Sequence, residues 1–349
     1  MKKLLLIGSN ASNAHLKHFL ALVRPYFEEV LVVSDAPVDF APSAYVSFSL
    51  KHPFQIYKSI RQLSHIIQAF QPTVIHVHQA NSYAFIAGQA NHKSIPLVLT
   101  VWGSDVLLLP KKSIFHRWLV KKGLQSARFI TADAITMKEA IHNLGIDTEV
   151  ILANFGVSVD LSSEIPKQRT LTLYSNRMHE PLYQIGELME GLSESLSCME
   201  GELIIAGRGS LTESLQQRVR ALGMEQRIRF VGFVDAQENR AFYLQSRFFV
   251  SIPTSDGTSI SLLEAMAYGC IPIVSDLPSN REWISDNVNG ILVQSHETLG
   301  SALQRGLQLD GNAVINFNRD LIAKHGTKEV NAQKFIAIYE AVLRSKITV

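Results

Sequence analysis

The segment Pro253–Gly269 contains the residues whose types and spacing are best suited to bind a charged ligand. Gly257 permits close approach to the backbone, and Thr258 and Ser259 suit a helix N-cap. The amides that follow, as far as Ile260, can hold a phosphate without a metal ion, because a helix N-terminus carries partial positive charge. The segment therefore predicts an anion site at the start of a helix.

Two acidic residues flank this anion site. Glu264 lies about a turn and a half into the predicted helix, where a carboxylate can accept hydrogen bonds from a vicinal diol such as a ribose. Asp256 precedes the helix and would face whatever is attached to the phosphate. Taken alone, the same segment also fits a well-capped amphipathic helix with two incidental acids.

The residues of this anion site must be positioned by the strands and helices around them. Short apolar, β-branched runs alternate with segments of helical period, which is typical of parallel sheets with crossover helices. The sequence predicts first-half strands at 3–7, 30–34, 73–78, 97–102, 128–131 and 150–153. It predicts second-half strands at 171–175, 203–206, 228–231, 248–252, 271–275 and 290–293. The polar stretch 157–169, interrupted by Pro166, is the predicted linker, so we expect an α/β protein with two doubly wound parallel sheets.

Composition excludes several other classes of protein. A chain of 349 residues with 46% hydrophobic and 18% charged residues fits two folded domains rather than disorder or a collagen-like repeat. Its two cysteines, Cys198 and Cys270, form neither a disulfide framework nor a Cys-rich metal site, which favours a reducing compartment. The apolar run near the start is shorter than the roughly 7 to 15 residues of a secretory signal. No run reaches the roughly 18 apolar residues that cross a bilayer.

Positive charge is concentrated in the first half. Residues 1–160 contain 15 Lys+Arg and 10 Asp+Glu, whereas residues 161–349 contain 18 and 21. Residues 111–128 contain six basic and no acidic side chains, interleaved at nearly helical spacing with Ile114, Phe115, Trp118, Leu119 and Leu124. This pattern fits a basic amphipathic helix on an anionic membrane. It fits equally a crossover helix with its apolar stripe in the core and a solvated basic face.

The Asp256 segment resembles the motif of retaining glycosyltransferases of family four. That motif has a carboxylate, a seven-residue gap, Glu, Ala-Met-Ala and Gly, and Asp256 stands where the family usually has Glu. Further family motifs are matched in order by Val74–His78, Thr100–Asp105, Ala153–Val157, Leu203–Gly209 and Val231–Val234. The resemblance implies a GT-B fold of two facing Rossmann-like domains. It implies an acceptor domain at 1–160, a nucleotide-sugar domain at 161–326, and a C-terminal helix at 327–349 returning to the first domain.

The resemblance also assigns roles to residues. Catalysis is assigned to Arg177 on the diphosphate, Asp256 orienting donor hydroxyls, and His78 near the sugar. Donor binding is assigned to Gly257, Thr258, Ser259, Ile260, Glu264, Gly207, Arg208, Gly232, Phe233 and Val234. The acceptor side is assigned to Gly8, Asn10, Ser12, Trp102 and Asp105. His76 alternates to the same face of its strand as His78 and is a weaker candidate.

Three departures from the family pattern affect these assignments. The usual Lys about five positions after Arg177 is missing, so Arg177 with the helix amides suffices, or Arg208 contributes, or catalysis is weak. Trp102 replaces a common His and cannot shuttle a proton. The loop from Gly8 replaces a Gly-Gly pair, and it either binds sugar hydroxyls or caps the next helix.

The implied activity is transfer of a sugar from a UDP- or GDP-linked donor to a glycan or lipid-linked acceptor, with retention and without a metal or other cofactor. We expect a cytoplasmic protein, at the inner face of the membrane if residues 111–128 bind lipid, and no nucleic-acid partner. A nicotinamide dehydrogenase is disfavoured because the Gly8 and Gly207 loops lack a complete Gly-x-Gly-x-x-Gly fingerprint. A nucleotide-sugar epimerase and a non-catalytic nucleotide-binding scaffold remain as alternatives.

Overall fold

The computed structural model describes residues 1–10, 13–92, 95–162, 164–166 and 171–344. The chain divides into two units, Met1–Phe155 with Lys328–Val349, and Gly156–Thr327. The first changeover lies a few residues before the predicted boundary at 160. Val157, at the start of the predicted linker, is 1% exposed and pairs with Thr327, so it belongs to the packed second unit.

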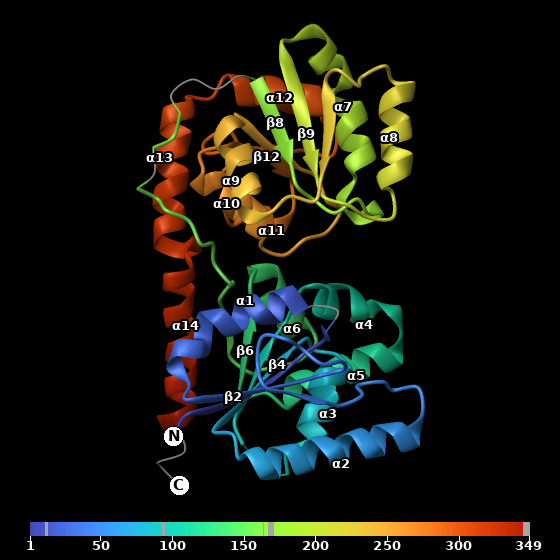
Figure 1. The fold of residues 1–349 in the computed structure, drawn as a ribbon, viewed down its shortest axis with the longest axis vertical. Coiled ribbons are helices and arrows are strands. Elements are labelled where there is room, and N and C mark those ends of the chain that lie inside the picture. Colours follow the sequence, from blue (N-terminus) through green and yellow to red (C-terminus); the bar gives the residue numbers. More distant parts are fainter. Residues whose placement is uncertain (11–12, 93–94, 163, 167–170, 345–349) are drawn as a thin grey trace. The chain divides into compact units, whose positions relative to one another are not determined.

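The first unit is built on a parallel sheet that, within the described residues, has seven strands in the order β3-β2-β1-β4-β5-β6-β7 (Figure 1). The strands are β1 Lys3–Ile7, β2 Glu29–Ser34, β3 Ser43–Tyr45, β4 Val74–His78, β5 Leu97–Thr100, β6 Phe129–Ala132 and β7 Val150–Leu152. Leu5 and Ile7 enter one apolar cluster and Leu4 and Leu6 another, because alternate side chains of a strand point to opposite faces. Both faces are therefore buried, as is usual for parallel sheets.

Helices cover both faces of this first sheet. They are α1 Asn13–Val23, α2 Pro53–Phe70, α3 Ser82–Ala90, α4 Leu109–Lys112, α5 Ile114–Gln125, α6 Ile135–Asn143 and α14 Lys328–Arg344. Side chains of α2, α3, α5 and α6 share the cluster of Leu5 and Ile7. Side chains of α1 and α14 share the other cluster, so the last described helix packs on the first unit.

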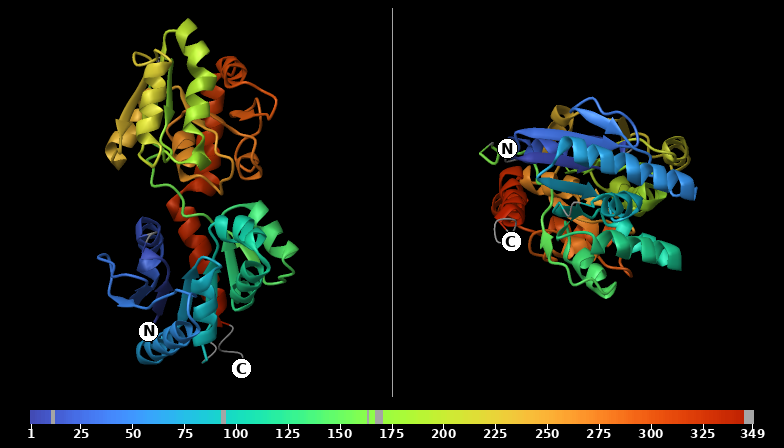
Figure 2. Two further views of the ribbon diagram at one scale, coloured as in Figure 1. Left: turned by 90° about the vertical axis from the view of Figure 1, so that its right-hand side faces the viewer. Right: turned by 90° about the horizontal axis from the view of Figure 1, so that it is seen from below.

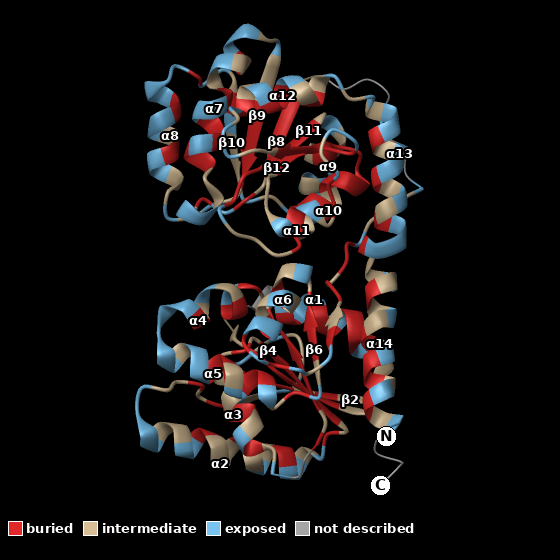
Figure 3. Cartoon of the chain, turned by 180° about the vertical axis from the view of Figure 1, so that it is seen from behind, coloured by how far each residue is buried: buried red, intermediate tan, exposed pale blue. Residues whose placement is uncertain are grey.

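The second unit repeats this architecture. Within the described residues its parallel sheet has six strands in the order β10-β9-β8-β11-β12-β13. They are β8 Leu171–Ser175, β9 Gly201–Ala206, β10 Ile228–Gly232, β11 Phe248–Ser251, β12 Ile271–Ser275 and β13 Ile291–Val293. The helices are α7 Ile185–Cys198, α8 Thr212–Ala221, α9 Ala236–Gln245, α10 Ile260–Ala267, α11 Pro278–Arg281, α12 Leu299–Leu307 and α13 Gly311–Leu321. One face packs α7, α8 and α12 and the other packs α9 and α10 (Figure 1 and Figure 2). The strands are largely buried (Figure 3), except the edge strand β10, of which only Ile228 is buried.

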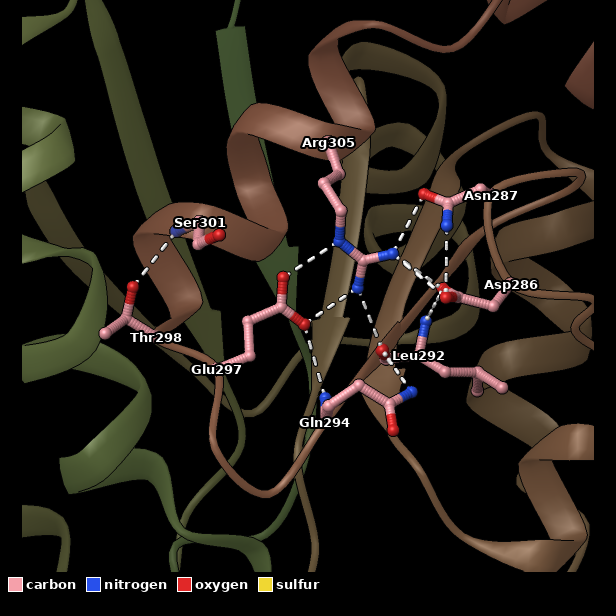
Figure 4. A network of polar contacts seen from close by, with 8 residues as sticks. All are labelled: Asp286, Asn287, Leu292, Gln294, Glu297, Thr298, Ser301 and Arg305. Carbon is pink, nitrogen blue, oxygen red and sulfur yellow. Dashed lines mark hydrogen bonds and ion pairs between the residues drawn. The ribbon is translucent and has the colours of Figure 1, made fainter.

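Arg305 of α12 fastens the edge strand β13 (Figure 4). Its guanidinium donates to Glu297 Oε1 at 2.8 Å, to the Leu292 carbonyl oxygen at 3.0 Å and to Asp286 at 3.0 Å. The hydrogen bond from Arg305 lowers the pKa of Glu297, which keeps this carboxylate charged. The network is structural, because it joins a helix to the last strand of the sheet.

The sequence pattern predicted the strands well and one helix poorly. All twelve predicted strands are present with small shifts at their ends, whereas β3 was not predicted, because Ser-Ala-Tyr has no apolar alternation. The predicted single helix over 111–128 is two helices, α4 and α5, separated at Ser113, whose side chain caps α5. Leu119 and Leu124 are buried as a core stripe would be, but Ile114, Phe115 and Trp118 are exposed.

Candidate functional site

The strand order of the second unit indicates a candidate ligand site. After β8 the chain continues to β9 on one side, and after β11 it continues to β12 on the other side. Ligands of doubly wound sheets bind at the carboxyl ends of two such neighbouring strands. Arg177 follows β8, and Asp256 to Ser259 follow β11. The fold thus brings together residues that are 79 positions apart in sequence.

Arg177 is held by three side chains. It is 9% exposed, its Nη2 donates to Asp256 Oδ2 at 2.6 Å and its Nη1 donates to Ser259 Oγ at 2.5 Å. The guanidinium also lies over the Tyr183 ring, 4.5 Å from its centroid. Burial raises the pKa of Asp256, and the charge of Arg177 opposes that rise. The result is a rigid cation with its planar fork fixed, which suits a phosphate oxygen pair.

The anion site predicted from sequence lies beside Arg177. Ser259 is the N-cap of α10, and its Oγ accepts from the Leu262 amide at 3.4 Å as well as from Arg177. The amides of Ile260 and Ser261 belong to the first turn, whose N–H groups have no acceptor within the helix. A guanidinium and a helix N-terminus therefore share one location, and both favour negative charge.

Glu264 is oriented by residues that the sequence analysis did not identify. Asn239 Nδ2 donates to Glu264 Oε2 at 3.2 Å, and the Tyr243 hydroxyl lies 3.2 Å from the same oxygen. Asn176 Nδ2 in turn lies 2.8 Å from the Tyr243 hydroxyl and 3.0 Å from Asn239 Oδ1. The spacing of Asn239 and Tyr243, one helical turn apart on α9, was the only signal in the sequence, and it does not identify their partner.

Gly207 and Gly209 have a packing role. Gly207 has φ of +112°, and a Cβ there would lie 2.6 Å from the Arg177 carbonyl oxygen. A Cβ on Gly209 would meet the carbonyl oxygen of His179. Both glycines therefore let the loop after β9 pack against the segment that carries Arg177. The predicted Gly-x-Gly element therefore packs against the backbone of the segment that carries Arg177.

The predicted nucleobase loop is exposed. Phe233 is 77% exposed, and Gly232 has φ of +74°, a conformation that favours glycine. A Cβ on Gly232 would lie 3.5 Å from Arg208 Nη2, so the exposed Arg208 side chain reaches over this loop, which continues into half-buried Val234. An aromatic ring and a guanidinium both offer flat surfaces on which a base can stack.

Unsatisfied polar atoms gather where β8 ends. Ser175 Oγ, Asn176 Oδ1 and Arg177 Nε are buried and have no hydrogen-bond partner within the described residues. Buried polar groups are nearly always paired, so such a run indicates a site completed by a ligand or water. No cation follows Arg177 on this segment, where Leu182 and Tyr183 stand near the family's Lys position.

The first unit has an equivalent position, after β1 and β4. A Cβ on Gly8 would lie 2.6 Å from Leu16, and the Asn10 amide donates to Asp35 Oδ1 at 2.7 Å. Asn10 Oδ1 is buried without a hydrogen-bond partner within the described part of the chain. Ser12, also predicted on the acceptor side, lies outside the described residues. The Gly8 loop thus keeps one polar group available for a ligand.

His78 has a different environment from the one expected. It is fully buried, and its Nδ1 accepts a hydrogen bond from Trp102 Nε1 at 3.0 Å. Burial, with a smaller effect of His15, lowers the pKa of His78 to about 3. His78 Nε2 is buried and has no hydrogen-bond partner within the described residues. The predicted contact of His78 with the sugar therefore stays a prediction, beside a role in positioning Trp102. His76 is also enclosed, between Tyr339 and Thr100.

We expect the buried imidazole of His78 to make folding sensitive to acid. The folded protein keeps His78 neutral, whereas the unfolded chain binds a proton below pH 6.5, so stability falls as pH is lowered from 6.5 toward 3. The slope from one such group is about 1.4 kcal/mol per pH unit. Urea titrations between neutral and mildly acidic pH should show that the free energy of unfolding of His78→Gln falls less steeply with decreasing pH than that of the wild type. The exposed control His65→Gln should keep the wild-type slope, and equal slopes for both would contradict this assignment.

Asp105 joins two loops at the strand ends. It is 4% exposed, and it accepts from the Ala80 amide at 2.7 Å and from the Trp102 amide at 2.9 Å. Burial raises its pKa and these amide bonds oppose the rise. The carboxylate is bound to the backbone, which gives Asp105 a structural role, and its place on the acceptor side stays a prediction.

Asp105→Ala is expected to lower the free energy of unfolding by about 2 to 4 kcal/mol, because two buried amides lose their acceptor. Chemical denaturation measures this loss directly. The exposed control Asp39→Ala should change stability little. A loss for Asp105→Ala no larger than that of the control would show that water replaces the carboxylate.

The described part of the chain lacks two kinds of feature. No group of three or more His, Cys, Asp or Glu there is arranged to hold a metal ion. None of the described helices is both long enough and apolar enough to traverse a bilayer.

Comparison with known families accounts for both units. The family model for "Glycosyl transferases group 1" matches residues 158–314, and that for "Glycosyl transferase 4-like" matches residues 3–134. Phosphatidyl-myo-inositol mannosyltransferase of Mycobacterium leprae is 26% identical over 83% of this chain and 81% of its own length. O-antigen chain mannosyltransferase RfbU of Salmonella typhimurium is 24% identical over 65% of this chain and 66% of its own length.

Solved structures show the same fold. A glycosyltransferase from Rickettsia africae aligns with a TM-score of 0.80 at 15% identity, covering 98% of each chain. HepE of Anabaena, in complex with UDP and glucose, aligns with a TM-score of 0.77 at 14% identity, covering 98% of this chain and all of that one. The two Rossmann-like units are those of a GT-B fold, as the sequence predicted, and both carry matches to glycosyltransferase families. The chain belongs to the group 1 glycosyltransferases.

Proposed function

We propose that this glycosyltransferase moves a sugar from a UDP- or GDP-linked donor to a hydroxyl group of a glycan or lipid-linked acceptor, with retention of configuration and without a metal ion. Transfer requires stabilisation of the leaving diphosphate as negative charge builds on it. The observation that carries the proposal is the position of Arg177, fixed beside the N-terminus of α10 where β8 and β11 diverge.

The donor fits around this cation in the following way. The diphosphate binds the Arg177 guanidinium and the amides of Ile260 and Ser261. The ribose diol donates to Glu264, whose orientation is set by Asn239 and Tyr243. Gly232 to Val234 face the base. Asp256 orients donor hydroxyls while it holds Arg177 in place.

The proton of the acceptor hydroxyl needs a base, and we assign it to the departing phosphate oxygen. This leaves no dedicated protein base, in agreement with the low pKa and the burial of His78. The bond between the anomeric carbon and the diphosphate oxygen breaks, and the acceptor oxygen bonds to the anomeric carbon on the same face, which retains the configuration of the sugar. Arginine and helix amides take the place of a cation on the diphosphate.

Relatives support the choice of donor and acceptor classes. Among them are a protein named phosphatidyl-myo-inositol mannosyltransferase and one named GDP-mannose:cellobiosyl-diphosphopolyprenol alpha-mannosyltransferase. We therefore favour an acceptor of cell-surface polysaccharide or glycolipid synthesis. Peripheral contact of residues 111–128 with the membrane would bring the enzyme to such an acceptor.

A donor-hydrolysis screen with UDP-glucose, UDP-galactose, UDP-N-acetylglucosamine and GDP-mannose tests this proposal. We expect one donor to be hydrolysed, with the released sugar keeping its anomeric configuration by proton NMR and with no effect of EDTA. Inversion or inhibition by EDTA would contradict the mechanism. Tight nucleotide binding without any turnover would favour a binding scaffold, and a change of sugar configuration without an acceptor would favour an epimerase.

A further inference from the structure

Trp102 lies where three neighbouring strands of the first unit end. It follows β5, and β5 is paired with β4, which ends in His78. The loop from Gly8 follows β1, the other partner of β4. Because the carboxyl ends of neighbouring parallel strands meet at one edge of a sheet, these three elements share the edge where ligands of such sheets bind. Trp102 is therefore a half-buried aromatic residue at a ligand-binding edge.

The indole N–H of Trp102 is already used inside the protein. Trp102 Nε1 donates to His78 Nδ1 at 3.0 Å, and His78 is fully buried. Nε1 is the one polar atom of a tryptophan side chain, and it can only donate. Burial lowers the pKa of His78 to about 3, so its imidazole is neutral and Nδ1 can accept this hydrogen bond. A ligand at Trp102 therefore contacts the aromatic ring and finds no spare hydrogen-bond donor on this side chain.

Several contacts fix the orientation of this ring. The His78 imidazole meets the indole nearly at right angles, with ring centroids 5.7 Å apart and 87° between the planes. The His15 ring is tilted against it, with centroids 5.1 Å apart. The Trp102 amide donates to Asp105 Oδ1 at 2.9 Å, and a π-helical turn, Ser104–Leu108, follows closely. Such turns are frequent at functional sites. The ring and its backbone are therefore held in place before a ligand binds.

We infer that Trp102 is a stacking platform for the ring of a pyranose, and that His78 is the positioning residue that holds this platform. The C–H groups on one face of a pyranose carry partial positive charge and are attracted to the negative face of an indole. The sugar hydroxyls need polar partners at the same edge. The Gly8 loop offers one, because Asn10 Oδ1 is buried without a hydrogen-bond partner within the described residues. An aromatic face with a few polar groups is typical of a site for an uncharged small ligand.

The inference rests on the proposed function and adds the kind of contact by which this chain recognises a sugar. Saturation-transfer NMR with the methyl glycosides of glucose, galactose, mannose and N-acetylglucosamine tests it without any turnover. We expect the ring C–H protons of at least one probe to receive saturation from the wild type. Trp102→Phe should retain transfer because it keeps an aromatic face, whereas Trp102→Leu should lose it. Phe317→Leu, which removes an exposed aromatic ring from α13, should behave like the wild type.

The indole N–H signal of Trp102 tests the role of His78. Trp102→Phe identifies this signal in the proton–nitrogen spectrum, because the signal disappears in that variant. His78→Gln keeps a hydrogen-bond acceptor and should preserve both the position of the signal and the sugar contact. His78→Leu removes the acceptor, so the signal should move upfield and saturation transfer should fall. Wild-type saturation transfer in a folded His78→Leu protein would show that His78 does not position the platform.

Kinetics with the donor found by the hydrolysis screen show which sugar the platform holds. Loss of one aromatic stack should raise the KM of the stacked substrate by about 10-fold. The kcat should change little, because the stack is equally strong before and during the reaction. A raised donor KM for Trp102→Leu in hydrolysis without an acceptor assigns the ring to the donor. An unchanged donor KM with a raised acceptor KM in transfer assigns the ring to the acceptor.

Two results would overturn the platform. One is the absence of saturation transfer from the wild type to every probe sugar, and the other is transfer that Trp102→Leu leaves unchanged. Sugar contact that is lost in Trp102→Leu while no donor is hydrolysed would count against the proposed transfer reaction and would keep the platform. The failure of the platform and the failure of the proposed function are therefore distinguishable.

Discussion

Arg177→Ala is expected to lower turnover by about 100-fold to 1000-fold, the loss typical when one fixed donor to a developing negative charge is removed. The guanidinium is the only cation that the structure fixes at the end of β8 among the described residues, and Tyr183, Asp256 and Ser259 hold it in place. No Lys follows to share its role, which makes the expected loss large. Initial rates with the donor found by the hydrolysis screen measure the effect.

Two further variants keep this prediction interpretable. Removing Arg177 leaves the half-buried Asp256 carboxylate without its partner, which destabilises the fold. Arg177→Lys keeps a positive charge there but loses the planar fork, so it should fold and still turn over slowly. Arg208→Ala should be milder and should act mainly on nucleotide affinity. Wild-type turnover in a folded Arg177→Ala protein would remove Arg177 from the mechanism.

Glu264→Ala is expected to weaken binding of UDP or GDP, whichever binds, by about 10-fold to 100-fold. Hydrogen bonds to a charged group contribute about 1.5 to 3 kcal/mol, and the alanine variant loses those to the ribose diol. Isothermal titration calorimetry measures the affinity. The exposed control Glu225→Ala should bind like the wild type.

A dideoxy nucleotide makes the second prediction specific to the ribose. The wild type should bind the 2′,3′-dideoxy form more weakly than the parent diphosphate, whereas Glu264→Ala should bind both equally, because the variant has no carboxylate for the diol. The dideoxy form should weaken binding to Tyr243→Phe less than binding to the wild type and more than binding to Glu264→Ala, since Tyr243→Phe removes one of the groups that orient Glu264. A dideoxy penalty that persists in Glu264→Ala would assign the diol to another residue.

Sequence patterns predicted what local chemistry specifies. The strand Leu171–Ser175 was predicted with its observed bounds, since apolar and β-branched residues ended by polar ones define a buried strand. Ser259 was identified as a helix cap because capping depends on residues within one turn. The family motifs placed Arg177 and Asp256 on the same site by register.

The sequence could not predict which side chains satisfy one another across the fold. His78 and Asp105 match family motifs, but only the tertiary structure shows that His78 accepts from Trp102 and that Asp105 accepts from two backbone amides. Glu264 was identified, but its partners on α9 were not.

The amino-acid sequence by itself determined two doubly wound sheets, the helix cap at Ser259 and the concentration of positive charge before residue 132. Tertiary structure alone decided that Arg177 is fixed between Asp256 and Ser259 and that Ile114, Phe115 and Trp118 face outward. The physical reason is the distance along the chain over which each interaction acts. Strand periods and helix caps arise from neighbours along the chain, whereas burial and ion pairing depend on how distant strands are ordered in the sheet.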